Sequence, residues 1–195
     1  MGTVRNLFAI IGVLAVLAGV AVSPYVWEVK TRFAEFDEKA LDTYVEMFRQ
    51  ILETGNAAEA TVWRSQVSDD LTAEEVDETI KFVANEHNIK NVGELPLYKQ
   101  VESMSGKPYR FVKIYMFCNA LTAAQMLDYS DAFAAYLPCR LSLVEDKQGK
   151  LWIYTLNMDP MIYGGKPLPP ELKAEAIKVK EIMLDVLDRG AKGDF

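Results

Sequence analysis

The segment CRLSLVEDKQGKLWIYTL, from Cys139 to Leu156, contains the clearest structural pattern in this chain. Residues Cys139–Glu145 and Lys150–Leu156 are rich in the apolar, β-branched and aromatic residues that favour strands. Between them lies Asp-Lys-Gln-Gly, whose last residue, Gly149, can adopt a positive φ without steric cost. The segment therefore predicts a β-hairpin, and with it an antiparallel sheet.

Upstream of this hairpin, two capping boxes predict the starts of two helices. In the first box Thr72 is the cap and Glu75 reaches back to it, which predicts a helix as far as about His87. In the second box Thr122 is the expected cap and Gln125 its partner. Each box satisfies amide groups that would otherwise lack a partner at the start of a helix.

Three further segments alternate in the manner of strands: Thr61–Val67, Asn88–Leu97 and Tyr109–Phe117. The loop Ser103–Pro108 separates the last two. A short helical turn is expected at Ser130-Asp131, before the chain enters the hairpin.

Downstream of the hairpin, Pro169-Pro170 predict the start of a last helix, which we expect to run to Arg189 and to be closed by Gly190. Its predicted buried stripe consists of Leu172, Ala176, Val179, Met183, Val186 and Leu187. The resulting order, β-α-β-β-α-β-β-α, predicts an α+β domain, with a mostly antiparallel sheet and helices packed on one face.

The N-terminal segment, residues 1–29, is predicted to be a membrane anchor. Residues 7–27 carry no charge and would span about 31 Å as a helix, enough to cross a hydrocarbon core of about 30 Å. Tyr25 and Trp27 would lie at the far interface, where aromatic side chains are favoured. With Arg5 on the inner side, the anchor crosses the cytoplasmic membrane once, and the remaining chain lies in the periplasm or outside the cell. The alternative is a secretory signal cleaved after Ala21, which also exports the domain.

Residues 30–55 are predicted to form an amphipathic connecting helix, followed by one domain over residues 56–195. The apolar positions recur every three to four residues: Phe33, Phe36, Ala40, Tyr44, Phe48 and Ile51. This helix could pack on the domain, pair with its copy in a second chain, or lie on the membrane surface. Its largely acidic outer face disfavours the membrane surface.

The charge distribution argues against nucleic acid as a partner. Arg5 is the only basic residue before Glu28, and all 28 acidic residues follow from there. A polyanion would be repelled by this acidic portion. We therefore expect the domain to meet a protein or a small ligand rather than a nucleic acid.

Cys118 and Cys139 are the only cysteines, and each lies at a strand boundary. In an exported protein an even number of cysteines first suggests a disulfide, here with two buried structural thiols as the related alternative. A reactive redox or sulfur-carrying thiol is the second interpretation, since Cys118 precedes a predicted helix whose N-terminus would lower a thiol pKa. The third is a metal or haem ligand.

Thioethers and a single histidine extend the third interpretation. Met116, Met158 and Met161 lie close in sequence to the cysteine segments, and thioethers with thiolate suit copper(I) or an axial haem position. Methionine is also an ordinary filler of cores. His87 is the only histidine and falls on the apolar face of its predicted helix, which favours a structural role over a ligand. No cofactor is required by the sequence; haem and copper are the ones that its sulfur residues suggest.

The segments Cys118-Asn119, Leu137–Asp146, Gly149-Lys150 and Asp159-Pro160 together resemble the family known as domain of unknown function 302. The resemblance spans about residues 61–160 and leaves the tail from Met161 onward outside the motif. Ala120 stands where the family often has proline, and Arg140 where it often has asparagine. The resemblance implies a small α+β domain that tends to form homodimers, and it implies no agreed activity.

Two hypotheses follow from these observations. In the first, the chain is a membrane-anchored accessory or ligand-binding module that is not itself catalytic, with a candidate pocket at the motif residues Asn119, Pro138, Arg140 and Asp159. In the second, Cys118 and Cys139 form a redox pair or help to bind haem or copper. We favour the first, because no constellation of residues in the sequence demands catalysis.

Overall fold

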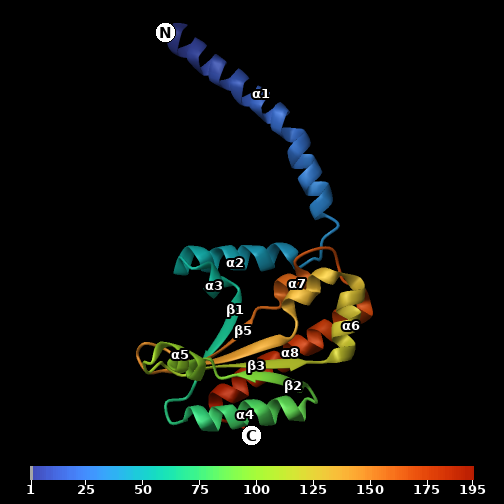
Figure 1. Cartoon of the computed structure of the whole chain (residues 1–195). Helices are drawn as coiled ribbons and strands as arrows, with labels where there is room; N and C mark the ends of the chain where they lie inside the picture. Colours follow the sequence, from blue (N-terminus) through green and yellow to red (C-terminus); the bar gives the residue numbers. More distant parts are fainter. Residues whose placement is uncertain (1) are drawn as a thin grey trace.

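The computed structural model describes residues 2–195, and its N-terminal helix stands apart from the rest of the molecule (Figure 1). Helix α1 spans Gly2–Phe33, and its part Phe8–Phe33 is exposed and has a mean hydropathy of 2.2. It is therefore long and apolar enough to cross a membrane. Met1, the first residue of the predicted anchor, lies outside the described residues, and so does the side chain of Arg5.

Five antiparallel strands form one sheet in the order β1-β5-β4-β3-β2. The strands are β1 (Val62–Gln66), β2 (Lys90–Leu95), β3 (Val112–Cys118), β4 (Cys139–Glu145) and β5 (Leu151–Leu156). The predicted hairpin is confirmed: β4 and β5 pair with Leu143 opposite Ile153, and Gly149 has a φ of 80° in the turn. The strand segments expected upstream are confirmed as well, with ends shifted by one to three residues.

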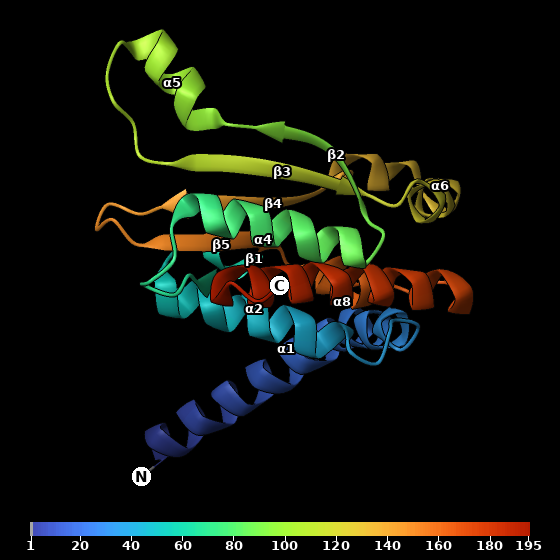
Figure 2. The same cartoon turned by 90° about the horizontal axis from the view of Figure 1, so that it is seen from below.

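Two helices, α4 (Ala73–Glu86) and α8 (Pro170–Lys192), cover one face of this sheet (Figures 1 and 2). The core lies between them and the alternate strand residues Tyr115, Phe117 and Leu141, which are fully buried. All six residues of the stripe predicted for α8 are buried. The predicted fold class, α+β with helices on one face of an antiparallel sheet, is confirmed.

The first predicted capping box is confirmed and the second is wrong. Thr72 accepts a hydrogen bond from the Glu75 amide at 3.2 Å, and Glu75 accepts one from the Thr72 amide at 2.8 Å. Helix α6 (Ala120–Tyr129), however, begins before Thr122. Its cap is Asn119, whose Oδ1 accepts from the amides of Leu121 at 3.1 Å and Thr122 at 3.3 Å. Asn119 lies three residues earlier and is an equally good cap, so the pattern at Thr122 was misleading.

The predicted end of the last helix is also wrong, because α8 continues through Gly190 to Lys192 and is capped by Gly193 with a φ of 73°. Gly190 has a packing role instead. A Cβ atom at this position would lie 3.0 Å from Ile80 Cγ1 and 3.1 Å from Ile153 Cδ1. The missing side chain thus lets α8 approach both α4 and the sheet.

Three short helices were not predicted: α3 (Ala57–Ala60), α5 (Leu97–Ser105) and α7 (Asp159–Tyr163). Each is too short for a clear apolar periodicity. The turn expected at Ser130-Asp131 is confirmed as the 3₁₀ helix η1 (Asp131–Tyr136), and Ser130 caps it.

The connecting helix is interrupted, contrary to the prediction of one helix over residues 30–55. Helix α1 ends at Phe33, residues 34–39 form turns, and α2 spans Ala40–Thr54. The interruption arises because Asp37 enters the domain: its amide donates to the Gly165 carbonyl at 2.8 Å, and its buried carboxylate pairs with Lys173. Tyr44 then donates to the Gly164 carbonyl at 2.5 Å, so α2 packs on the domain beside α7.

Candidate functional site

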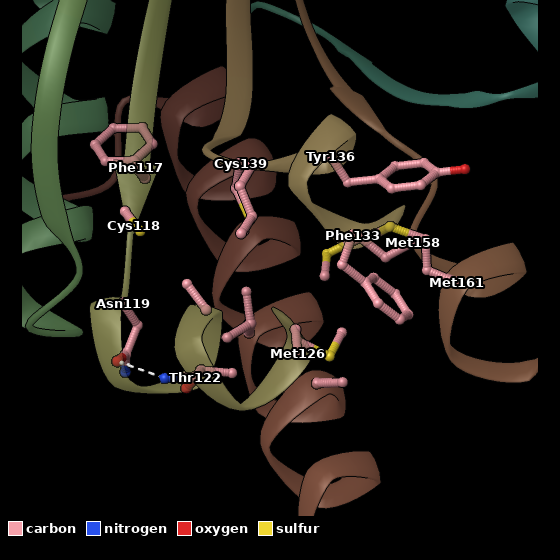
Figure 3. A pocket seen from close by; sticks show the side chains of 14 residues that line it. Phe117, Cys118, Asn119, Thr122, Met126, Phe133, Tyr136, Cys139, Met158 and Met161 are labelled. Atoms are coloured by element: carbon pink, nitrogen blue, oxygen red, sulfur yellow. Dashed lines mark hydrogen bonds between the residues drawn. The ribbon is translucent and has the colours of Figure 1, made fainter. Parts of the chain in front are cut away.

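A small cavity lies at the end of the sheet where β3 ends and β4 begins, enclosed by α6, η1, α7 and α8 (Figure 3). The centre of a water molecule could occupy about 40 Å³ of it. Its lining is almost entirely apolar and sulfur-containing: Phe117, Cys118, Asn119, Thr122, Ala123, Met126, Phe133, Tyr136, Leu137, Cys139, Met158, Met161, Ala176 and Val179. This space exceeds the roughly 10–15 Å³ that one water requires.

Both cysteines contribute to this cavity. In the pairing of β3 with β4, Phe117 lies opposite Cys139, so Cys118 and Cys139 are close neighbours on adjacent strands. Both are half-buried free thiols in the structure. Burial, and next the neighbouring Cys118, raise the pKa of Cys139 to about 11. The Cys139 thiol is therefore protonated at neutral pH, which makes it a poor nucleophile.

Three methionines line the cavity, of which the sequence singled out two. Met158, just before α7, and Met161 within α7 line the same cavity as the two cysteines (Figure 3). Met126 of α6 joins them and is buried. Met116 does not line the cavity: it pairs in register with Arg140 and lies over Gly93.

Of the four motif residues predicted for a pocket, only Asn119 lines the cavity, and its side-chain oxygen is already engaged in capping α6. Arg140 is exposed on the face of the sheet opposite to Cys139, as the alternation along a strand requires. Asp159 forms an ion pair with Lys180 at 2.5 Å. Pro138 lies between two lining residues without lining the cavity itself.

His87 lies elsewhere in the molecule. Its Nε2 is 2.7 Å from a carboxylate oxygen of Asp185, so the residue links the C-terminal end of α4 to α8. The side chain is one-third exposed rather than facing the core. His87 thus caps α4 instead of lying on its apolar face, and it is separate from the sulfur residues of the cavity.

The aromatic wall of the cavity was not predicted. Phe133 and Tyr136, both on η1, have ring centroids 6.3 Å apart and line the cavity on its η1 side. The only signal in the sequence was their spacing of three residues, which in a 3₁₀ helix places side chains on the same side.

A second group of polar side chains, also missed from the sequence, lies between α4 and the β2–β3 edge of the sheet. Asp77 accepts hydrogen bonds from Lys81 at 2.8 Å, Lys113 at 2.5 Å and Tyr115 at 2.5 Å. Lys113 also pairs with Glu94 at 2.7 Å. Burial, and next the hydrogen bond to Asp77, raise the pKa of Tyr115 far above its ordinary value. Every charge in this group has a partner, so the group stabilises the fold and leaves no free acid or base.

A family model and a solved structure are similar to this chain, and both agree with the α+β fold. The sequence model of a family described as domain of unknown function DUF302 matches residues 64–190, well over half of the chain. The match continues past residue 160 and includes most of α8, which the motif had left outside. A crystal structure of an uncharacterised conserved DUF302 protein from Bacillus stearothermophilus superposes with a TM-score of 0.54 at 18% sequence identity, covering 66% of this chain and 97% of that one. No curated protein matches the chain.

Proposed function

The chain belongs to the DUF302 family, and from the cavity that this domain encloses we propose that it is a membrane-anchored, non-catalytic module that binds a small ligand between Cys118 and Cys139. In this proposal α1 crosses the cytoplasmic membrane once, and the domain lies in the periplasm or outside the cell.

The observation that supports the proposal is an apolar, sulfur-lined cavity, partly open to solvent, at one end of the sheet. Protein interiors are packed about as densely as organic crystals, and an unfilled apolar space costs stability. A concave, mostly apolar pocket with a few polar groups is the usual form of a small-ligand site. The space available suits a ligand of only a few heavy atoms or a single ion.

The chemistry of the lining favours binding over catalysis. None of the described residues that line the cavity carries a carboxylate, an imidazole or an amine. The remaining candidates for proton transfer are Tyr136 and the two cysteines, and the raised pKa of Cys139 keeps its thiol protonated. This also weakens thiol–disulfide exchange, which proceeds through a thiolate.

The test uses the full-length chain, extracted from its own membrane in mild detergent. Its mass is measured once by native mass spectrometry and once under denaturing conditions. We expect the native mass to exceed the denatured mass by that of one small ligand. In Ala123→Leu the added side chain enters the cavity and should abolish the difference. Ala124→Leu, the matched control, adds the same atoms on the exposed side of α6 and should preserve it.

Xenon under pressure provides a second measurement, because it enters apolar cavities without needing a specific ligand. Pocket resonances of the wild type and of Ala124→Leu should shift with xenon pressure, whereas those of Ala123→Leu should not. The proposal is wrong if the wild type releases no ligand mass and its response to xenon is the same as that of Ala123→Leu.

A further inference from the structure

The cavity between β3, β4, α6 and α7 brings together five sulfur atoms from separate parts of the chain. Cys118 ends β3, and Cys139 begins β4. Met126 comes from α6, and Met158 and Met161 come from the start of α7 (Figure 3). The segments involved span more than forty residues, so the fold rather than local sequence creates the cluster.

Hard donors are missing from this lining. The polar side chains apart from the thiols and Tyr136 are Asn119 and Thr122. Asn119 uses its oxygen to cap α6, and the Thr122 hydroxyl donates to Glu175 at 3.3 Å. Calcium and magnesium require several oxygen ligands, and these cannot be assembled here.

A zinc site of the common kind is also disfavoured. Such sites use four ligands drawn mostly from cysteine and histidine, and the described residues contain no group of three or more cysteine, histidine or acidic side chains placed to hold a metal. Thiolate together with thioether is instead the donor set that selects copper(I). Copper(I) is also satisfied by two or three sulfur ligands, fewer than zinc requires.

We propose that this cavity binds one copper(I) ion through Cys118 and Cys139, with a thioether of Met126, Met158 or Met161 completing the coordination. The inference rests on the proposed function and names its ligand. Each thiol that coordinates the ion releases its proton to solvent and forms a sulfur–copper bond. No electron is transferred in this step, because copper arrives and remains in its +1 state.

The surroundings suit a weakly hydrated monovalent ion. Met126 and Met158 are buried, and Phe133 and Tyr136 add aromatic surface to the lining. A bound ion would exchange its solvent ligands for sulfur in a setting of low polarity. Binding replaces the two thiol protons by one copper(I) ion, so the ion and its two thiolates together carry one net negative charge.

The experiment titrates the full-length chain in detergent with copper(I), without oxygen and with bicinchoninate as the competing indicator. We expect one equivalent to bind, and X-ray absorption at the copper edge to show sulfur neighbours only. Cys139→Ser and Cys118→Ser should each weaken binding at least about tenfold, since loss of even an outer partner of a metal site costs that much.

A methionine pair provides variants that will fold whatever the cysteine variants do, because leucine conserves the volume of methionine. Replacing Met158 and Met161 together by leucine should weaken binding and remove part of the sulfur signal. Met116→Leu is the matched control: this methionine lies outside the cavity and its replacement should change neither.

Two results would overturn the inference: binding of less than a tenth of an equivalent, or binding that neither the cysteine nor the methionine variants alter. If copper(I) does not bind but another small ligand or xenon occupies the cavity, the proposed ligand is wrong and the binding function stands. If nothing occupies the cavity, both are wrong.

Discussion

Asp77 is a single residue that joins a helix to the sheet. Its side chain is one-fifth exposed and accepts hydrogen bonds from Lys81, Lys113 and Tyr115. Burial alone would raise the pKa of this carboxyl, but the hydrogen bonds from Lys113, Lys81 and Tyr115 outweigh burial and lower it. A carboxyl whose folded pKa is lowered stabilises the fold above its unfolded pKa of about 3.9, and this stabilisation is lost as the pH falls through the folded value.

Replacing Asp77 by asparagine removes this charge and leaves Lys113 with Glu94 alone. We expect the free energy of unfolding at pH 7 to fall by about 2 kcal/mol, less than for a fully buried pair because the group is partly solvated. The difference between wild type and variant should shrink as the pH is lowered from 5 to 3. Urea unfolding followed by tryptophan fluorescence at both pH values measures it. Glu78→Gln, at an exposed position of the same helix, is the control, and an equal loss at both pH values would contradict the assignment.

At the same scale, part of the cavity was predictable and part was not. The sequence brought Cys118, Cys139, Met158 and Met161 together as sulfur candidates, and all four line one cavity. The prediction was wrong for Met116. The pairing register decides which face of the sheet a strand residue occupies, and proximity in sequence does not. Nothing in the sequence indicated the contact between Asp77 and Tyr115, which are 38 positions apart.

Helix α2 carries an exposed apolar stripe at Leu41, Val45, Phe48 and Leu52. The spacing of four, three and four residues is that of a coiled-coil seam. In an antiparallel pair of two copies, Asp42 of one helix would lie near Arg49 of the other, so the flanking charges are complementary. Arg49 bonds Glu46 of its own helix at 2.5 Å and is exposed, so it can exchange partners. The predicted homodimer stays a prediction, and this stripe is where we expect the second copy.

Phe48→Glu places a carboxylate in the middle of that stripe and should shift the full-length chain from dimer to monomer. Sedimentation of detergent-solubilised protein over a range of concentrations measures the change. Glu53→Gln alters charge outside the stripe and should leave the dimer intact. Equal masses for wild type and Phe48→Glu at every concentration would contradict self-association through α2. If a wild-type α2 peptide binds liposomes and the peptide carrying Phe48→Glu does not, the stripe contacts the lipid surface instead.

Elements with a long pattern were predictable, whereas short ones and their ends were not. The stripe of α8 and the hairpin of β4 and β5 follow directly from periodicity and turn composition. The ends of α6 and α8 depended on choosing between neighbouring caps, Asn119 or Thr122 and Gly190 or Gly193. At the end of α8 a tertiary contact explains the outcome, since Gly190 lies inside the helix where α8 meets Ile80 and Ile153.

On the scale of the whole molecule, helix α1 and the domain are joined by a short segment, residues 34–39, that contacts the domain. Asp37 is buried and pairs with Lys173 at the start of α8, and Glu35 pairs with Lys166 at 2.6 Å. The prediction of one continuous connecting helix did not foresee this contact, because in an amphipathic pattern Asp37 looks like part of the polar face. Residues before α2 therefore already contact the domain.

The orientation of α1 in a membrane would determine the compartment in which the proposed ligand reaches the cavity. Arg5 precedes the apolar segment, and Lys30 and Arg32 follow it, with Arg32 paired to Glu28 at 2.9 Å. We expect Arg5 to stay inside and the domain to be exported, because a basic residue just before an apolar segment favours the cytoplasmic side. Fused after Phe195 in a bacterial host, alkaline phosphatase should be active and green fluorescent protein dark. Replacing Lys30 and Arg32 by glutamine should preserve this result, whereas Arg5→Glu should reduce phosphatase activity. Fluorescence of the wild-type fusion would mean that the domain faces the cytoplasm.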